Sequence, residues 1–249
     1  MKYTLLFIIG FGCSAGLMAQ LSTDADFKRQ VYDREYTMGL SFHSRGYALN
    51  GRYLKYLDGF NKHGLEIDLT KLRHPKETHQ NFVAATGVRG FVYGRVNSFY
   101  ALRAGYAREK ILFDKTDQGS VSIAWNYSGG LSLGLLKPVY VMVPRGGDYN
   151  NTLEPVRYDP EEHDLVVGEA NYFKGIGGTK LRPGIYAKTG FIFDYDLLDK
   201  KVTAIEGGFI FDYYFAKVPI FYFQQGDKDQ NLSGFYQLYV TFNFGYKKN

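Results

Sequence analysis

Charged side chains recur on one face of the alternating segments of this chain. The strand parity places nine of them on the inward face: Glu66, Asp68, Arg89, Arg95, Arg103, Lys188, Asp194, Glu206 and Asp212. Arg89 and Arg95 share their face with Phe91 and Tyr93, so the parity there is ambiguous. Five are acids and four are bases, so the set is nearly balanced. If this face is enclosed, opposite charges must pair across the interior, because an unpaired charge in a dry interior is strongly disfavoured. A salt-bridged filling of the interior and an ion-selective passage are the two roles open to such a set.

Other residues that could carry chemistry lack a complete set of partners. His43 lies two residues from Ser41 and so shares its strand face, but no third member of a Ser/His hydrolytic site is evident. His74 and His79 fall in a turn without the partners of a metal site. The sequence therefore predicts no enzyme, no metal site and no cofactor.

Two loop motifs are also incomplete. The acidic cluster at 159–164 contains Asp159, Glu161, Glu162, His163 and Asp164, but it lacks the glycine and the ligand order of a dedicated calcium loop. The glycine-rich residues 175–178 lack the Lys-Ser/Thr pair and the strand-to-helix context of a phosphate loop. We interpret both as solvated loop segments.

Residues 120–136 show most clearly what must position the charges. Read with a period of two, one face is apolar and the other is small or polar. The apolar face consists of Val121, Ile123, Trp125, Tyr127, Leu131, Leu133 and Leu135. The stretch exceeds the usual five or six residues of a strand in a soluble domain, whereas about ten tilted residues cross a bilayer. A strand with one apolar face and one face of small or polar residues is typical of the wall of a membrane barrel.

Composition agrees with an all-β protein. The 249 residues include 22 Tyr, 20 Phe and 29 Gly, which favours strands, bends and aromatic belts over helices. After the N-terminus no apolar run approaches the roughly 18 residues of a spanning helix. The net charge of +5 is small for this length and is not concentrated in a patch, so it does not indicate nucleic-acid binding.

Residues 1–19 have the organisation of a cleaved signal peptide, which implies export. Lys2 provides the positive charge, residues 4–11 provide the apolar region, and Ala19 ends a small-residue cleavage site before Gln20. Cys13 invites a lipoprotein interpretation, but the residues before it lack the usual pattern. Cleavage after Ala19 leaves no cysteine, which excludes disulfides and cysteine-ligated metals.

The alternation predicts a single barrel domain over 20–249, antiparallel and transmembrane. Its eight strands are expected at 36–45, 63–72, 82–96, 99–107, 120–136, 184–195, 201–215 and 234–246. The strand parity at 82–96 is ambiguous. The connections at 46–62, 137–183 and 217–231 are expected on the cell exterior, with both termini in the periplasm. Eight is an even number, as closure of bacterial barrels requires. Ten strands result if 139–143 and 218–223 form separate strands.

With these patterns the chain resembles small outer-membrane β-barrels of the Bacteroidota type, including the PorG-like and OmpW-like groups. The resemblance is carried by residues 127–134 and by the aromatic, alternating strand at 236–246. That terminal strand is similar to the signal read by barrel-assembly machinery, although Lys247, Lys248 and Asn249 follow it where such signals usually end on Phe. The resemblance implies an outer-membrane location and either of two roles. Some members of these groups are accessory subunits of secretion or assembly machines, and others bind or pass small apolar molecules.

Two functional hypotheses follow. The first is a non-enzymatic barrel surrounded by outer-membrane lipid, whose loop at 137–183 docks on membrane-protein partners of an assembly or secretion complex. The residues expected to dock are Tyr149, Tyr158, Tyr172 and Phe173. The second is a small transport barrel or porin for small or apolar solutes. A soluble lipid-binding barrel would need its apolar face inside. We choose lipid outside because the other faces are poor in bulky residues or rich in charge.

Overall fold

The computed structural model describes residues 32–74, 90–115, 120–145, 152–162, 166–195, 200–223 and 231–249. The predicted signal peptide at 1–19 and its Cys13 lie outside the described residues, as do His79, His163 and Asp164. Within the described part of the chain, no helix is long and apolar enough to cross a membrane.

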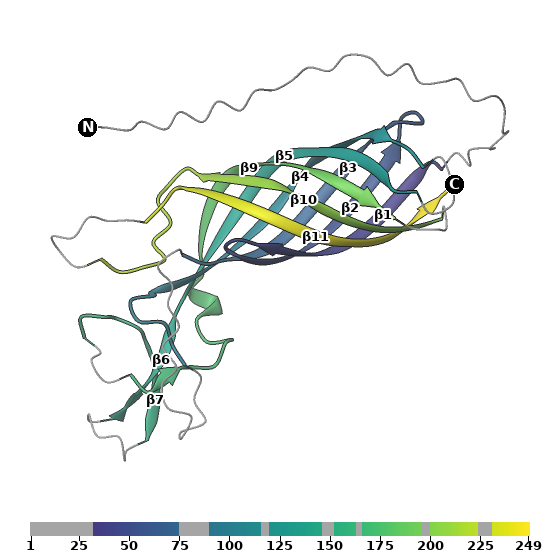
Figure 1. Cartoon of the computed structure of the whole chain (residues 1–249). Coiled ribbons are helices and arrows are strands. Elements are labelled where there is room, and N and C mark those ends of the chain that lie inside the picture. The colour runs from purple at the N-terminus through teal and green to yellow at the C-terminus, as the bar shows by residue number, and fades with distance from the viewer. Residues whose placement is uncertain are drawn as a thin grey trace, which may run out of the picture. The chain divides into compact units, whose positions relative to one another are not determined.

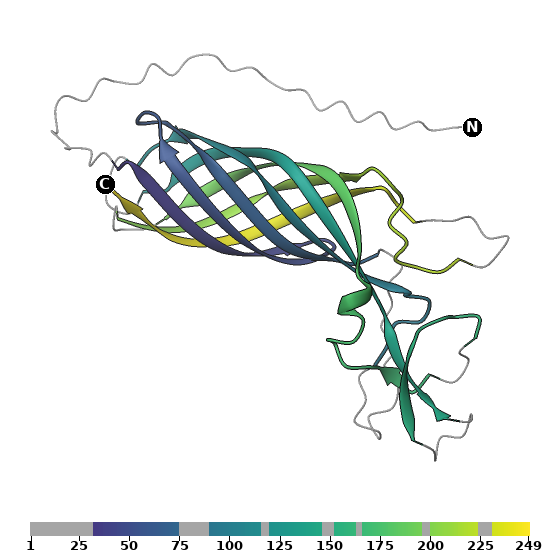
Figure 2. The ribbon, with the colours of Figure 1, turned by 180° about the vertical axis from the view of Figure 1, so that it is seen from behind.

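Eight antiparallel strands close into a barrel (Figures 1 and 2). They are β1 (Arg34–His43), β2 (Gly46–Tyr56), β3 (Asn61–Leu72), β4 (Asn97–Phe113), β5 (Ser122–Pro138), β9 (Lys180–Asp194), β10 (Lys201–Tyr214) and β11 (Gly234–Lys248). The order around the barrel is β1-β11-β10-β9-β5-β4-β3-β2, so the first and last strands pair and leave no free edge. The predicted fold class and the even strand number are confirmed.

The side chains of β5 alternate between the outside and the inside of the barrel, as the sequence predicts. Trp125 is 41% exposed, whereas Asn126 beside it is fully buried. The same parity holds in the other barrel strands: Phe209 and Phe242 are outside, while Glu66 is fully buried. The apolar face is therefore the outer face, and the polar face is enclosed.

β2 corrects the predicted loop at 46–62. Tyr47 and Leu49 face outward, and Asn50 and Arg52 are buried inside the barrel. The inward polar residues made this segment look like a loop, although polar inward residues are what the charged interior requires. β1 and β2 are joined directly by a turn at Ser44 and Arg45, and β2 and β3 by the turn at 57–60.

The predicted strand at 82–96 is wrong in its described part. Residues 82–89 lie outside the described residues, and residues 90–96 do not belong to the barrel wall. Instead Phe91 and Val92 are buried in apolar clusters at the loop end of the barrel. The next barrel strand begins at Asn97, where a tight connection was expected. The structure adds β2 to the predicted barrel strands and removes the predicted strand at 82–96, so the number of barrel strands remains eight.

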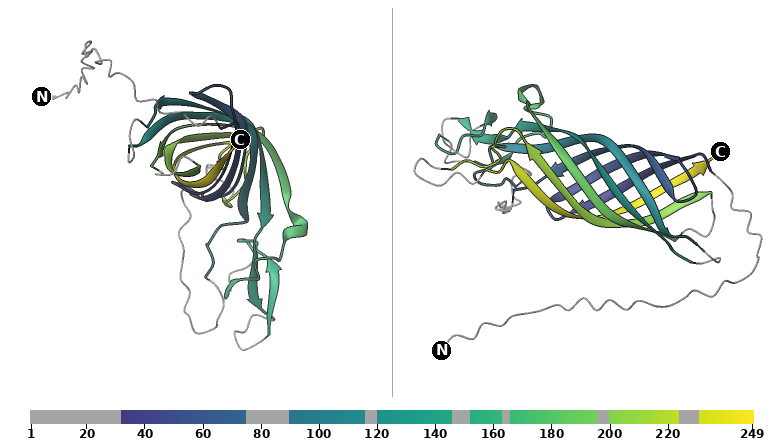
Figure 3. Two further views of the ribbon diagram at one scale, coloured as in Figure 1. Left: turned by 90° about the vertical axis from the view of Figure 1, so that its right-hand side faces the viewer. Right: turned by 90° about the horizontal axis from the view of Figure 1, so that it is seen from above.

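The connection between β5 and β9 contains a small folded sheet. Its strands are β6 (Tyr140–Pro144), β7 (Leu153–Arg157) and β8 (Gly168–Glu169) in the order β7-β6-β8, followed by the 3-10 turn η3 (Ile176–Gly178). β6 belongs to this sheet, and residues 218–223 contribute a single bridge, Phe221 to Arg95. The ten-strand alternative is therefore wrong for the described residues (Figure 3). The connection spans 139–179, slightly less than the predicted 137–183.

Candidate functional site: the enclosed charge network

The barrel interior holds more ionisable side chains than the sequence predicted. Six acids and four bases of the described barrel strands are buried inside: Glu35, Arg52, Lys62, Glu66, Asp68, Arg103, Glu109, Lys188, Glu206 and Asp212. The small and polar inward positions of the strands provide the room for these long side chains.

Glu206 on β10 is the centre of the network. Its carboxylate accepts hydrogen bonds from Arg52 Nη2 at 2.8 Å and from Tyr239 Oη at 2.7 Å. The amides of Asn126 and Asn243 donate to it at 2.9 and 3.1 Å. Three other strands thus supply four donors to the two oxygens of one carboxylate. Arg52 Nε, Asn126 Oδ1 and Asn243 Oδ1 are buried there without a hydrogen-bond partner among the described residues.

Lys188 on β9 connects this centre to β3. Its ammonium donates to Glu66 and lies 3.5 Å from a carboxylate oxygen of Glu206. Arg52 also approaches Glu66, with 3.6 Å between Nε and Oε2. The two bases and two acids alternate around a closed circuit, so each charge has an opposite neighbour.

A second group lies nearer the barrel end at which β11 ends. Lys62 donates to Glu35 at 2.9 Å and to Glu109 at 2.6 Å. Tyr56 Oη also donates to Glu35, at 2.9 Å. Arg52 Nη1 lies 4.0 Å from Glu109 and so joins this group to the central one.

A third group lies toward the opposite, loop end. Arg103 makes two parallel bonds to Asp212, Nε to Oδ1 and Nη2 to Oδ2, both at 2.7 Å. Gln237 Nε2 also donates to Asp212, at 2.7 Å. Asp68 is 4.0 Å from Arg103. The two bonds between Arg103 and Asp212 fix the orientation of the guanidinium plane and connect β4 to β10 across the interior.

An apolar cluster closes the loop end above the network. The rings of Phe99, Tyr214 and Phe235 are buried, with centroid separations of 5.1 to 5.9 Å. Val218 and Ile220 from the β10–β11 connection complete the cluster. Backbone bonds from residues 96 and 97 to the Ile220 carbonyl hold that connection in place.

The other end of the barrel has a smaller apolar cluster. Ile111, Ala124, Ile192, Val202 and Ala204 are all buried there. The central charges therefore have an apolar cluster toward each end of the barrel, and the Lys62 group lies at the same end as the smaller cluster. An ion that crossed the interior would have to leave water and displace paired charges, which is energetically unfavourable.

The structure separates the predicted charge set into three groups. Glu66, Asp68, Arg103, Lys188, Glu206 and Asp212 lie together inside the barrel. Asp194 is at the rim, 3.2 Å from Lys115 and 3.7 Å from Lys247. Arg95 lies outside the barrel wall and pairs with Glu169 at 3.0 Å. Arg89 lies outside the described residues.

Four buried charged residues were not predicted from the sequence to lie inside the barrel: Glu35, Arg52, Lys62 and Glu109. Glu109 has the same parity as Arg103, so extending the predicted strand at 99–107 would have included it. Arg52 and Lys62 fell in the supposed loop at 46–62. Glu35 lies one residue before the predicted first strand.

The predicted docking residues also divide. Tyr158 is buried: its ring lies 5.8 Å from that of Phe91, and the Gly94 amide donates to its hydroxyl at 3.2 Å. Burial raises the pKa of that hydroxyl. Only 3% of Tyr158 is exposed, and its contact with a partner stays a prediction. Tyr172 and Phe173 are exposed, by 43% and 73%, and Tyr149 lies outside the described residues.

The described members of the other chemical candidates make these contacts. Ser41 Oγ bonds Thr241 Oγ1 at 2.7 Å, and the His74 ring lies tilted against Phe221 with 5.0 Å between centroids. No group of three or more potential metal ligands occurs among the described residues. In the acidic loop cluster, Glu161 accepts a bond from Tyr222.

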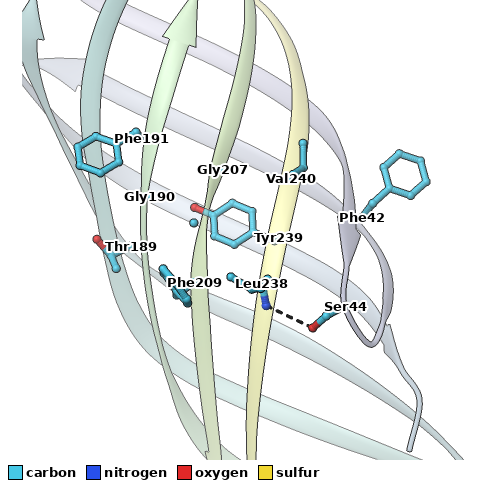
Figure 4. Close-up of a pocket in the computed structure, with 11 residues that line it drawn as sticks. Phe42, Ser44, Thr189, Gly190, Phe191, Gly207, Phe209, Leu238, Tyr239 and Val240 are labelled. Atoms are coloured by element: carbon cyan, nitrogen blue, oxygen red, sulfur yellow. Dashed lines mark hydrogen bonds between the residues drawn. The ribbon is translucent and has the colours of Figure 1, made fainter. Parts of the chain in front are cut away.

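A groove on the outer wall was not predicted. It measures about 760 Å³ and crosses strands β9, β10 and β11, where Gly207 provides no side chain. Its apolar walls include Phe191, Phe209 and Leu238 (Figure 4). The Leu238 amide donates to Ser44 Oγ at the loop end of the groove.

A second, basic pocket of about 360 Å³ adjoins this groove. It is lined by His43, Arg45, Arg73 and His74 among others, and it shares Phe42 and Ser44 with the groove. The two hollows thus meet at the turn between β1 and β2, where Arg45 Cζ lies 5.6 Å from the centroid of the buried Phe235 ring.

Comparison with known proteins identifies no family. No family model matches the chain, and no curated protein matches it. Among solved structures, Neisserial surface protein A is 10% identical with a TM-score of 0.37, over 87% of this chain and 96% of that one. A major outer membrane protein from Thermus thermophilus is 11% identical with a TM-score of 0.44, over 88% and 100%. The fold assignment rests on strand pairing and burial, and the resemblance to PorG-like and OmpW-like proteins stays a prediction.

Proposed function

We propose that this chain is a non-enzymatic, integral barrel of the bacterial outer membrane with a closed interior. The observation that carries the proposal is the paired charge network in the barrel interior, with an apolar cluster toward each end. The exposed apolar outer face supports placement in lipid, because such a face would be unfavourable in water. The barrel then serves as a rigid membrane body rather than as a passage.

Planar-bilayer recording tests this proposal. The purified, refolded barrel should insert without producing ion-conducting steps. The positive control is a porin treated in the same detergent, so that silence reflects a closed interior and not failed insertion. Regular steps from the refolded chain would contradict the proposal and favour the transport alternative.

The connection 139–179 is the part that would meet partner proteins. Its sheet has its own buried residues, among them Val141 and Tyr158, and is more than a link between two strands requires. Phe173 lies in the same connection and is 73% exposed. We propose that this connection lies at the cell surface and binds another outer-membrane protein of an assembly or secretion complex.

Purification of the tagged chain from its native membrane in mild detergent tests this docking role. A partner present in a fixed ratio should be lost with Phe173→Ser. Phe113→Ser is the matched control, because Phe113 is 66% exposed at the other end of the barrel. A solitary monomer, or a partner retained equally by both variants, would contradict docking through this connection.

A further inference from the structure

The wall groove and the basic pocket together have the chemistry of a lipid-binding site. We propose that they bind one phosphorylated lipid, with an acyl chain in the groove and the phosphate in the pocket. This inference rests on the proposed membrane placement and adds a specific ligand class to it.

The groove is suited to a hydrocarbon chain. Gly207 faces outward, and a side chain added there would meet only ordinary contact with the Tyr239 carbonyl oxygen, at 3.8 Å. The hollow is flanked by Phe191, Phe209 and Leu238, so a chain lying in it would contact apolar atoms on both sides. The groove opens on the outer face, where acyl chains surround a membrane barrel.

The pocket is suited to a phosphate. Neither Arg45 nor Arg73 forms an ion pair with another described residue. The Arg45 guanidinium lies over the Phe235 ring, 5.6 Å from its centroid, and its Nη1 is a buried donor without a hydrogen-bond partner. Burial lowers the pKa of Arg45, since no carboxylate compensates its charge. A phosphate would supply the missing acceptors, because guanidinium groups match phosphate oxygens in geometry and charge.

The arrangement of the two parts favours a lipid over a free phosphate. Phe42 and Ser44 line both cavities, so the basic pocket adjoins the apolar groove at these two residues. The turn that carries Arg45 lies at the loop end of the barrel, where a lipid headgroup would lie in the adjacent leaflet. The acyl chain of a lipid therefore fits the apolar groove, and its phosphate fits the basic pocket.

The single tryptophan of the chain is a suitable reporter. Trp125 donates from Nε1 to Thr189 Oγ1 at 2.9 Å, and it lies opposite Phe191 in the β5–β9 pairing. Both contact residues line the groove. Brominated phosphatidate, titrated into the folded protein in dodecyl maltoside, should therefore quench Trp125 fluorescence with saturation.

Two variants and their matched controls separate the site from general lipid contact. Arg45→Gln with Arg73→Gln should weaken the apparent affinity about tenfold or more, because it removes two charged donors. Lys174→Gln with Lys180→Gln removes the same charge from exposed loop-end positions and should leave the affinity unchanged.

The groove is tested in the same way. Gly207→Leu fills the hollow and should abolish saturable quenching. Gly51→Leu adds the same side chain at another outward glycine with open space around it, and should have no effect.

Three results would overturn the proposal. The first is that a brominated fatty alcohol quenches Trp125 as saturably as brominated phosphatidate does. The second is that inorganic phosphate at equal concentration fully reverses the quenching. The third is that each variant binds the lipid as its control variant does. Heat-dependent electrophoretic mobility, measured on the same samples, reports the folded barrel. A folded barrel without saturable quenching would refute the lipid site and leave the proposed membrane placement intact.

Discussion

Removing one member of the Arg103–Asp212 pair should destabilise the barrel more than any change at its rim. Both side chains are fully buried and share two bonds of 2.7 Å. At roughly 1.5–3 kcal/mol for each bond to a charged group, the contact is worth about 3–6 kcal/mol when one partner is lost. Breaking a buried pair is expected to cost about 3–5 kcal/mol, because the remaining charge is left uncompensated. Either Arg103→Gln or Asp212→Asn should therefore lower the free energy of unfolding by about 3–5 kcal/mol.

The double variant distinguishes pairing from general loss of packing. With both charges removed, neither member of the pair is left without its partner, so the cost should fall short of the sum of the single costs by about 2–4 kcal/mol. The 4.0 Å contact of Asp68 with Arg103 is lost equally in the Arg103→Gln single variant and in the double variant, so it does not change this difference. Urea unfolding in lipid vesicles, followed by the fluorescence of Trp125, provides the three values. As a rim control, Lys115→Gln disturbs a partly exposed 3.2 Å contact with Asp194 and should cost about 1 kcal/mol or less. Additive costs within about 0.5 kcal/mol would refute the reasoning.

Three further predictions concern the ends and the wall of the barrel. Phe99→Ala removes a buried ring from the loop-end cluster and should lower the free energy of unfolding by about 3–5 kcal/mol, while bilayer recordings stay silent because the charge network remains. Gly208→Ala should cost at least about 1–3 kcal/mol by urea titration, since its Cβ would lie 2.1 Å from the Thr189 carbonyl oxygen, whereas Gly51→Ala meets no atom within 4 Å and should be near neutral. Hydrogen bonds from the Phe60 backbone N–H and from the Asn61 side-chain amide hold the pKa of the Asp58 carboxyl below its usual 3.8. The contribution of Asp58 to the free energy of unfolding is thus fully present above pH 3.8 and is lost as the pH falls through the lower pKa of the folded state. The difference in stability between the native chain and Asp58→Ala should therefore shrink when the pH is lowered. A difference that grows at low pH would contradict this sign.

The sequence allowed the barrel and its parity to be predicted because the side-chain period of a strand is two. Trp125 and Phe242 alternate with small or polar residues over long stretches, so the lipid-facing side could be identified without coordinates. The same rule failed at β2, because Asn50 and Arg52 face inward and interrupt the usual composition of a strand. Register and strand number depend on pairing between distant segments, which periodicity alone does not specify.

The charge network could be predicted only in part for a related reason. Parity indicates which side of a strand a residue occupies, but pairing across the interior depends on the shear of the closed barrel. Glu206 and Lys188 were expected inside, yet their shared contacts with Arg52 and Glu66 join strands that are far apart in the sequence. The groove at Gly207 was not predicted, because it arises from an absent side chain among bulky neighbours on three strands.

Nitroxide accessibility along β5 tests the central claim most directly. In the chain from Gln20 onward, which contains no cysteine, single cysteines would replace Ile123, Tyr127, Leu131 and Leu133 on the outer face and Ala124, Ser128 and Ser132 on the inner face. In lipid vesicles, labels on the outer set should collide with oxygen dissolved in the bilayer, and labels on the inner set should be protected from both oxygen and a water-soluble nickel chelate. Inner labels that collide freely with the nickel chelate would show a water-filled interior and contradict the closed, charge-paired barrel.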